Sequence, residues 1–527
     1  MSAADLALPF LLALVPITWL VFALIALRWP AWKAAIGSLA AACVLGGTHW
    51  ALPVPLIASA AAEGFVMALW PIVLVIVAAV FTYNLCVHTG AMDVIGRMVT
   101  SLSCDRRVLA LLVAWCFGGF MEGMSGFGTA IAIPAGMLAA LGFPPLQAVL
   151  ICLVANGVPT CFGSVGVPTT SLADLVGLDV GRLAFTEMVQ LTPFFLIAPF
   201  LVVLIAGEGP GTNGPVPTAR PSVAERLRGM VPLAFVAGVA FVLPSLAVAA
   251  FVGPELTLVV GSLCSLAATA LLARRSPEPP TRFKMQVAVG EPITARGALR
   301  SWSCFILVFA LLLVTSKLVA PVNAFFAQFS SQVQVYVGPD PATVSFSWVN
   351  TPGVWIFLAA FAGGTIQSCS VREMLGVLTA TVKQMLPTTV TMLSVLGCAK
   401  VMGYTGMIGS ISAFCIAVTG ALFPLVAPVI GAVGSFVTGS GTSAGLLFGT
   451  VQLQAATALG MDSYWIVALN SLGVAAGKMI SPQSLAIGMA AARVVGKDAE
   501  LLRRALPYAV AFLVLMAVFA FAGAAVL

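Results

Sequence analysis

Long apolar segments separated by short polar ones occupy almost the whole chain. Ten of these segments approach the roughly 20 residues that cross the hydrocarbon core of a bilayer as an α-helix. The pattern therefore predicts an all-α, polytopic membrane protein. The predicted spans are residues 8–27, 34–52, 64–87, 185–206, 231–250, 255–273, 302–320, 348–368, 383–403 and 507–527.

Four further apolar regions are interrupted by glycine, proline, serine, threonine and asparagine. Regions 146–170 and 463–488 are long enough to cross, and we predict that each is a broken helix. Regions 108–142 and 424–460 contain more breaks, and we predict re-entrant hairpins that enter and leave on one side. Irregular backbone persists at membrane depth only where protein or water satisfies its polar groups. Breaks in matching positions of two halves therefore indicate the substrate site of a transporter.

The interrupted regions belong to two copies of one unit. Each copy has the order span, Thr-Gly turn, short arm, hairpin and broken helix, with arms predicted at 91–103 and 407–420. Matching residues keep a nearly constant spacing, which supports a duplication. The pairs are His88–Tyr404 at a spacing of 316, Ser125–Ser443 and Gly142–Gly460 at 318, and Asn156–Asn470, Gly163–Gly477 and Pro168–Pro482 at 314.

This repeat divides the chain into three parts. The first and last parts each contain one repeat unit, and the middle part connects them. The parts are 1–230 with repeat unit 64–184, 231–373 with further spans and a cytoplasmic loop at 274–300, and 374–527 with repeat unit 383–490.

Composition agrees with a membrane protein and excludes an ordinary soluble domain. Hydrophobic residues make up 61% of the 527 residues and charged residues 8%, whereas soluble domains carry roughly 25% charge. The net charge of +6 resides in short loops, so it does not indicate a nucleic-acid partner. The 11 cysteines are scattered without metal-ligand spacing, and no hydrolase motif is present. We expect no metal, no cofactor and no enzymatic activity.

The basic residues predict how the chain is oriented. Cytoplasmic loops are enriched in lysine and arginine. With the N-terminus outside, twelve crossings and two hairpins bring every basic cluster to the cytoplasmic side. Both termini then lie outside, and the two hairpins open from opposite sides, so the repeat is inverted. The clusters are Arg28/Lys33, Arg97/Arg106/Arg107, Arg220/Arg226/Arg228, Arg274 to Arg300, Arg372/Lys383 and Arg493 to Arg504.

Several segments resemble the L-lactate permease family. They are EGMSGFG at 122–128, LGFPPLQAVLICLVANGVPTCFGSVGVP at 141–168, GKMISPQSLAIGMAAARVVGKDAELLRR at 477–504, FVGPEL at 251–256 and LWPIVLVIVAAVF at 69–81. The likeness extends from about residue 10 to the C-terminus. It implies import of L-lactate, and often D-lactate and glycolate, across the cell inner membrane in symport with protons and without a cofactor. It also implies an elevator-type carrier with paired hairpins, as a monomer or a homodimer.

The chain departs from the family pattern at the hairpins. Gly441 stands where the family commonly has an acid, and Gly445 where it has an amide. Thr129-Ala130 replaces a family proline in the first hairpin. Glu63 and Lys400 occupy positions that are usually uncharged, and we expect both side chains to reach the membrane interface from span ends.

A short carboxylate in a dry site needs groups that replace water around its charge. Helix N-termini supply backbone N–H groups, and hydroxyl and amide side chains supply further hydrogen bonds. The same side chains could instead only satisfy broken helix ends, and the sequence leaves both readings open. The substrate-binding candidates are Ser125, Gly126, Thr129, Asn156, Thr160, Thr442, Ser443, Asn470, Ser481 and Gln483.

Three charged residues are candidates for charge recognition and coupling. Lys478 lies inside the second broken helix and could bind the carboxylate, pair with an acid or cap a helix. Glu122 opens the first hairpin motif and is the first candidate for carrying a proton. Asp174, just after the first broken helix, is the second, although a loop role is the alternative.

Two alternatives remain within the carrier class. The loss of an acid at Gly441 together with the gain of Lys400 makes the site more positive. That change would fit a di- or tricarboxylate or sulfonated cargo, or coupling to Na⁺. A passive channel is less consistent with duplicated hairpins, since these suit alternating access.

Overall fold

The computed structural model describes residues 3–27, 29–126, 128–208, 221–285, 293–316, 318–339, 343–494 and 497–525. Parts of the expected segments lie outside the described residues. They are Arg28, Phe127, Arg220, residues 286–292 of the expected 274–300 loop, residues 495–496 of the last basic cluster, and the end of the span expected at 507–527.

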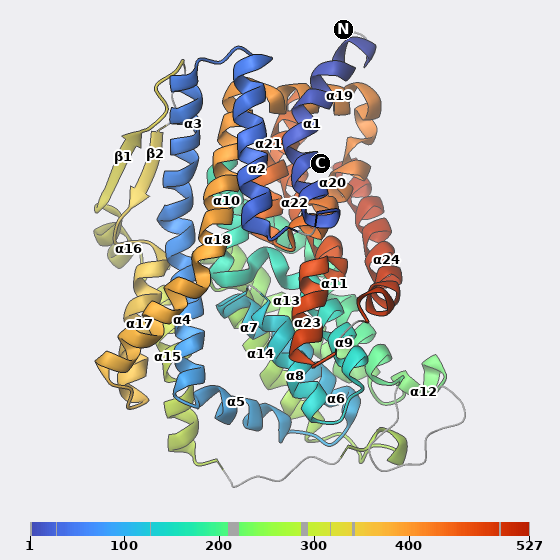
Figure 1. The fold of residues 1–527 in the computed structure, drawn as a ribbon. Helices are drawn as coiled ribbons and strands as arrows, with labels where there is room; N and C mark the ends of the chain where they lie inside the picture. Colours follow the sequence, from blue (N-terminus) through green and yellow to red (C-terminus); the bar gives the residue numbers. More distant parts are fainter. Residues whose placement is uncertain are drawn as a thin grey trace.

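Helices make up most of the described chain (Figure 1). The first half contains the first hairpin and the first broken helix. Its elements are α1 (Ala3–Ile25), α2 (Ala31–Thr48), α3 (Val54–Met67), η1 (Ala68–Val73), α4 (Leu74–His88), α5 (Ala91–Thr100), α6 (Arg106–Ala110), η2 (Leu111–Phe117), α7 (Gly118–Met124), α8 (Thr129–Ala140), α9 (Pro145–Gly157), η3 (Val158–Phe162), α10 (Gly163–Val176), α11 (Val180–Ala206) and α12 (Val223–Leu227).

The remaining elements comprise the middle spans and the second repeat unit. They are α13 (Val231–Phe251), α14 (Thr257–Ala273), η4 (Thr281–Phe283), α15 (Ala295–Thr315), α16 (Ala320–Ala327), β1 (Ser330–Gln334), β2 (Thr343–Ser347), α17 (Pro352–Ile366), α18 (Val371–Thr405), α19 (Met407–Thr419), η5 (Gly420–Leu422), α20 (Phe423–Thr438), α21 (Gly441–Leu459), α22 (Ser463–Ile480), α23 (Pro482–Ala491) and α24 (Asp498–Ala524).

Eleven described helical segments are long and apolar enough to cross a membrane. They do not coincide with the twelve expected crossings. The set includes Arg106–Met124 and Met407–Thr438, which contain limbs of the expected hairpins, and it omits the shorter helices α14 and α17. Length and hydropathy alone do not distinguish a span from a hairpin limb, so the count of twelve stays a prediction.

A two-stranded antiparallel sheet corrects the all-α expectation. Strands β1 and β2 pair with Ser330 opposite Ser347, and α16 precedes them. The sequence SSQVQ of β1 contains a single apolar residue, Val333, so it gives no strand pattern that the sequence could reveal. This hairpin lies at the upper left of Figure 1, beside α3.

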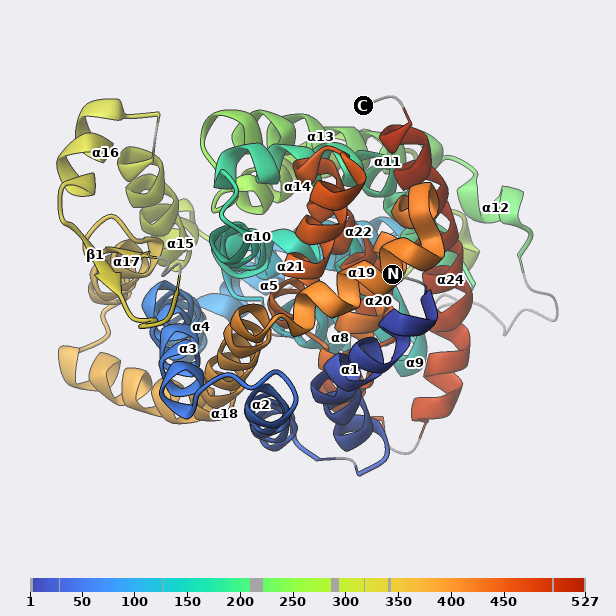
Figure 2. The same ribbon diagram turned by 90° about the horizontal axis from the view of Figure 1, so that it is seen from above.

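Two groups of helices lie side by side when the molecule is seen from above (Figure 2). One group contains α3, α4 and α15 to α18, in which α18 packs on α2 and α3, and α17 packs on α4 and α15. We call this group the scaffold side. The other group contains both hairpins and both broken helices, together with α11, α13, α14 and α24, and we call it the hairpin side.

The two repeat units pack crosswise on the hairpin side. The first hairpin consists of α7 and α8, and its α8 contacts α23 of the second broken helix. The second hairpin consists of α20 and α21, and its α21 contacts α10 of the first broken helix. Helices α9 and α22 also contact each other. This arrangement brings both hairpin turns to both helix breaks.

Candidate functional site

All four polar interruptions meet at one small cavity of about 50 Å³. Both hairpin turns and both helix breaks contribute to its wall, because the repeat units cross there. The lining residues are Glu122, Gly128, Thr160, Gly163, Ser164, Pro168, Gly439, Ser440, Gly441, Thr442, Lys478, Gln483, Ser484 and Ile487.

A buried ion pair joins the two repeat units at this cavity. Lys478 Nζ lies 2.8 Å from Glu122 Oε1, and the two side chains are 6% and 2% exposed. Asn156 donates from Nδ2 to Glu122 Oε2 at 2.9 Å. Gly163 faces the same carboxylate so closely that a Cβ there would lie 2.5 Å from Oε1. Glu122 is therefore fixed between α9, the start of α10 and α22.

The first hairpin turn is held against the first helix break. Ser164 Oγ donates to the carbonyl oxygen of Ser125 at 2.7 Å, and Thr129 Oγ1 donates to the carbonyl oxygen of Gly126. Gly126 and Gly128 have φ values of +59° and +86°, which favour glycine. A side chain at Gly126 would overlap Ser164 Oγ.

The first break itself has strained backbone. Ser164 and Val165 have φ values of +47° and +58°, a conformation that costs about 1–3 kcal/mol for such residues and persists mainly at functional sites. Gly166 follows with φ +74° and approaches the backbone of Pro254 on the neighbouring chain segment. The break is thus determined by packing rather than by local preference.

Helix N-termini of the second unit face the cavity. Ser440 caps α21 by accepting from the Ser443 amide, and Ser481 caps α23 by accepting from the Ser484 amide. The first N–H groups of a helix have no partner within it and carry partial positive charge. The amides of Gly441, Thr442 and Gln483 lie in these first turns. They complement Lys478 as anion-binding groups.

The predicted residues fall into two groups, those that line the cavity and those that do not. Glu122, Thr160, Thr442, Lys478 and Gln483 line the cavity. The others are buried around it or part of the turns without lining it. These are Ser125, Gly126, Thr129, Asn156, Ser443, Asn470 and Ser481.

Several polar atoms around the cavity have no protein partner. Ser125 Oγ and Asn156 Oδ1 are buried without a hydrogen bond, and so are both side-chain polar atoms of Asn470. Buried polar groups are normally satisfied.

Two expectations about charged residues are wrong. Glu63 and Lys400 do not reach an interface: Glu63 is fully buried, and its Oε1 lies 2.8 Å from Lys400 Nζ. Tyr404 Oη also donates to the Glu63 carboxylate. α18 brings Lys400 against α3, and this contact between distant segments gives the two charges each other as partners. Asp174 lies within α10 rather than in a loop.

Asp174 is also separate from the cavity between the hairpins. Asp174 is exposed, and it lines a larger cavity of about 630 Å³ whose wall also includes Glu63, Lys400 and Glu255. This larger cavity lies between the scaffold side and the α10 segment that follows the first break, because residues of η1, β2 and α18 line its other wall.

Sequence reasoning did not select four residues of the site region. Ser164, Ser440 and Ser484 line the cavity, and only their position beside glycine or proline could have indicated them. Glu187 is fully buried in α11. As an acid within an apolar span it carried a usable signal, since intramembrane acids are functional candidates by default.

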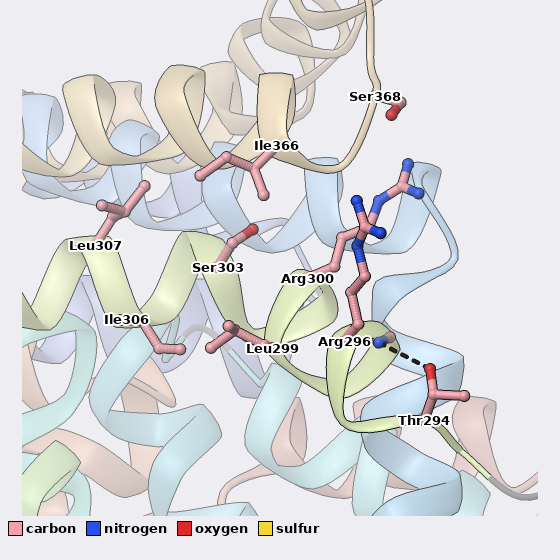
Figure 3. A pocket seen from close by; sticks show the side chains of 10 residues that line it. Thr294, Arg296, Leu299, Arg300, Ser303, Ile306, Leu307, Ile366 and Ser368 are labelled. Carbon is pink, nitrogen blue, oxygen red and sulfur yellow. Dashed lines mark hydrogen bonds between the residues drawn. The ribbon is translucent and has the colours of Figure 1, made fainter.

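A third cavity, of about 660 Å³, shares no residue with the site. Figure 3 shows Arg296 and Arg300 of α15 reaching into it toward Ser368, with apolar side chains such as Leu307 and Ile366 beyond them. Arg300 also donates to the carbonyl oxygen of Gln367.

The chain is similar to known permeases over most of its length. A family profile described as L-lactate permease matches residues 9–527. An L-lactate permease of Streptococcus iniae is 39% identical over 473 residues, covering 88% of this chain and 94% of that protein. The glycolate permease GlcA of Escherichia coli is 30% identical over 547 residues, covering 97% and 95%. The solved structure of the YdaH transporter of Alcanivorax borkumensis matches with a TM-score of 0.48 and 14% identity, covering 88% and 86%.

Proposed function

The chain belongs to the L-lactate permease family, and from that premise we propose that it is a secondary active transporter for short 2-hydroxy monocarboxylates. Its cargo is L-lactate, with D-lactate and glycolate as related substrates. It imports them across the inner membrane with a proton, as a monomer or homodimer with both termini outside. The convergence of both hairpins and both helix breaks on one cation carries this proposal.

Lys478 binds the substrate carboxylate in this mechanism. Its ammonium lies in the cavity beside the first amides of α21 and α23. Together these groups replace the water around the anion. Thr160, Thr442 and Gln483 line the same space and offer hydroxyl and amide groups to the substrate hydroxyl.

Glu122 couples the substrate to a proton. Without substrate, its carboxylate neutralises Lys478 at 2.8 Å. When Glu122 takes up a proton, the ammonium loses its partner and the carboxylate of lactate can replace it. The buried charges balance in both states, because one proton enters with one anion. Asp174 on the 630 Å³ cavity is the second residue that we propose for the proton path.

Cavity size supports a small cargo over the alternatives. A volume of about 50 Å³ corresponds to a few water molecules, since one water needs about 10–15 Å³ on this measure. A di- or tricarboxylate would need more space and further cations. Gly441 lets Thr160 and Val474 approach closely, since a Cβ there would lie 3.0 Å from the Thr160 methyl group and 3.3 Å from Val474, which keeps the cavity small.

Alternating access would move the hairpin side against the scaffold side. The two groups of helices are distinct in Figure 2, and the 630 Å³ cavity lies between them. Such a movement would carry the cavity between the hairpins as a unit. It agrees with the crosswise packing, which ties the four polar segments to one another.

Uptake of labelled lactate into proteoliposomes tests the proposal. We expect accumulation above the outside concentration when the lumen is alkaline, and equilibration only when the two sides have equal pH. Replacing Na⁺ by K⁺ should change nothing. Uptake that follows a Na⁺ gradient and ignores the pH gradient would contradict proton coupling, and the absence of lactate uptake under all gradients would contradict the cargo.

A further inference from the structure

A second carboxyl group lies between the two broken helices, away from Lys478. Glu187 of α11 is fully buried. Its Oε2 lies 2.5 Å from Thr169 Oγ1 of α10, and its Oε1 lies 2.5 Å from Ser471 Oγ of α22. One side chain therefore connects both discontinuous helices to α11.

The hydroxyl of Thr169 has a second neighbour. Its Oγ1 is also 2.9 Å from the carbonyl oxygen of Cys161 in η3. A hydroxyl has one hydrogen to donate, and a carbonyl oxygen can only accept. If Thr169 donates to Cys161, the contact with Glu187 needs a hydrogen on the carboxyl group.

A protonated Glu187 satisfies the whole network. Ser471 then donates to Oε1, Glu187 donates from Oε2 to Thr169, and Thr169 donates to the Cys161 carbonyl. In the ionised state Thr169 must turn its hydrogen to Glu187, and the Cys161 carbonyl loses that donor. The protonation state of Glu187 thus decides a hydrogen bond in the break of the first helix.

The surroundings of Glu187 offer no charge that would stabilise a carboxylate. Among the described residues no cation forms an ion pair with it. The titratable group that faces it is the thiol of Cys161, and burying an unpaired carboxylate favours the neutral form. Among the elements packed on α11, α13 carries no titratable group. The others carry Cys152 on α9, Cys116 on η2, Asp174 on α10, Tyr464 and Lys478 on α22, Arg106 and Arg107 on α6, and Glu225 and Arg226 on α12.

We propose that Glu187 is a second proton-binding site, distinct from Glu122, and that its proton keeps the substrate cavity in the binding conformation. The inference rests on the proposed function and deepens it. Cys161 directly follows Thr160, and Gly163 lies two residues further; both of these neighbours line the cavity. When Glu187 loses its proton, the Cys161 carbonyl loses its hydrogen bond from Thr169, and the cavity wall formed by Thr160 and Gly163 is disturbed.

The bound cation is a proton rather than a metal ion. The two contacts of 2.5 Å to the carboxylate oxygens are hydrogen-bond distances. Each carboxylate oxygen thus already has a hydroxyl partner. Addition of Na⁺ should therefore not replace the proton in any assay.

Lactate exchange between proteoliposome lumen and bath, at equal pH on both sides, measures this site without net proton movement. With two proton sites, the exchange rate of the natural protein should fall by more than tenfold per pH unit in the alkaline range. Glu122→Gln and Glu187→Gln each remove one proton site. The exchange rate of each single variant should therefore fall by about tenfold per pH unit. The double variant should be nearly independent of pH. Glu278→Gln, at a side chain that is 89% exposed, is the matched control.

A profile of Glu187→Gln as steep as that of the natural protein would overturn the inference. If the exchange rate of the single variant Glu122→Gln no longer depended on pH, the inference would be overturned as well, because Glu187 would then contribute no pH dependence. If no variant and no natural protein exchanges lactate although all are folded, the proposed function fails instead. A rate restored by Na⁺ at alkaline pH would show a metal site and contradict the proton.

Two further measurements keep the test independent of transport and of folding. Infrared difference spectra between acidic and alkaline buffer should contain a protonated carboxyl band that persists in Glu122→Gln and disappears in Glu187→Gln. Thr169→Val removes the hydroxyl that donates to the Cys161 carbonyl, so the exchange rate should be low at every pH and should fall no more steeply than in Glu187→Gln, whereas Thr169→Ser should keep the profile of the natural protein. An unchanged spectrum or profile would contradict the assignment.

Discussion

Glu122 and Lys478 are stable in the interior only as a pair. Desolvation costs several kcal/mol for each charge, and a close partner with additional hydrogen bonds offsets that cost. The 2.8 Å contact and the amide of Asn156 provide both for Glu122. A third charge that enters the cavity must therefore arrive with a compensating proton, which is the physical basis of the coupling proposed above.

Lys478→Ala should abolish lactate binding and also destabilise the protein. The variant leaves Glu122 buried without its partner, which costs about 3–5 kcal/mol unless the carboxyl group takes up a proton. Binding by calorimetry and thermal unfolding in detergent measure the two effects. Lys383→Ala, at an exposed position of α18, is the control. Normal affinity in Lys478→Ala would contradict its role.

The pair of Glu63 and Lys400 should behave differently. The two side chains pair with each other at the wall of the 630 Å³ cavity, and Tyr404 also donates to Glu63. Glu63→Ala should lower the free energy of unfolding by about 3–5 kcal/mol, while the KM for lactate changes little in the folded fraction. The exchanged pair Glu63→Lys with Lys400→Glu should recover much of the stability. A tenfold change in KM would instead assign the pair to substrate binding.

Gly441→Asp tests the most distinctive departure from the family pattern. A Cβ at this position would lie 3.0 Å from the Thr160 methyl group, and the added carboxylate would enter a cavity that already holds Glu122. We expect weaker lactate binding and a shift of the transport optimum to lower pH, where one carboxyl group is neutral. An identical pH profile and affinity would show that residue 441 does not face the substrate.

At the scale of elements, glycines determine how closely the broken helices approach the hairpins. A Cβ at Gly473 of α22 would lie 1.8 Å from the carbonyl oxygen of Pro428 in α20, and one at Gly431 of α20 would lie 2.1 Å from that of Asn470. Backbone contact of this kind is typical of helix packing in membranes. It fixes α22, and with it Lys478, relative to the second hairpin.

Gly473→Ala should therefore loosen the second repeat unit. The added methyl group cannot fit without moving α20, and such overpacking costs about 1–3 kcal/mol. Thermal unfolding should shift to lower temperature, and the lactate affinity should fall because Lys478 moves with α22. Gly376→Ala on α18, where nothing lies within 4 Å, should leave both unchanged. If Gly473→Ala and Gly376→Ala had the same unfolding temperature and the same lactate affinity, tight packing at Gly473 would be contradicted.

At the scale of the whole molecule, the basic elements gather at one end. Helices α5, α6 and α12 lie together at the lower end of Figure 1, while the β1–β2 hairpin lies near the upper end. The backbone of Lys284 pairs with that of Asp105, directly before α6, in an isolated antiparallel β-bridge. Lys284 Nζ lies 3.7 Å from Glu278 Oε2. The loop charges predict that this end faces the cytoplasm.

Cysteine labelling should reveal that orientation. In a Cys264→Ser background, which removes the exposed native thiol, Glu278→Cys should react with a membrane-impermeant maleimide only after the inner face is opened. Val337→Cys, at a 65% exposed position beside the β-hairpin, should react in intact cells. The reverse labelling pattern would contradict the predicted orientation and place both termini on the cytoplasmic side.

The sequence determined the features that depend on local chemistry. Hydropathy predicted the membrane class and most helices, since burying apolar segments in lipid needs no knowledge of their neighbours. Glycine, proline and hydroxyl residues predicted which segments contain breaks, because such residues weaken a regular helix locally, but packing decided the positive φ values of Ser164 and Val165. Five of the predicted residues line the cavity for this reason, including Glu122 and Lys478. Strand β1, with Val333 as its one apolar residue, gave no pattern from which a strand could be predicted.

Only the tertiary structure decided which of these groups meet. Glu122 and Lys478 are 356 residues apart in the chain, and Glu187 reaches Ser471 across 284. Glu63 finds Lys400 for the same reason, and the sequence alone favoured interfacial charges for both. The angles at which helices cross depend on the packing of whole faces, which apolar periodicity does not specify. The sequence therefore determined the polar segments, and the crossing of the two repeat units decided that they form one site.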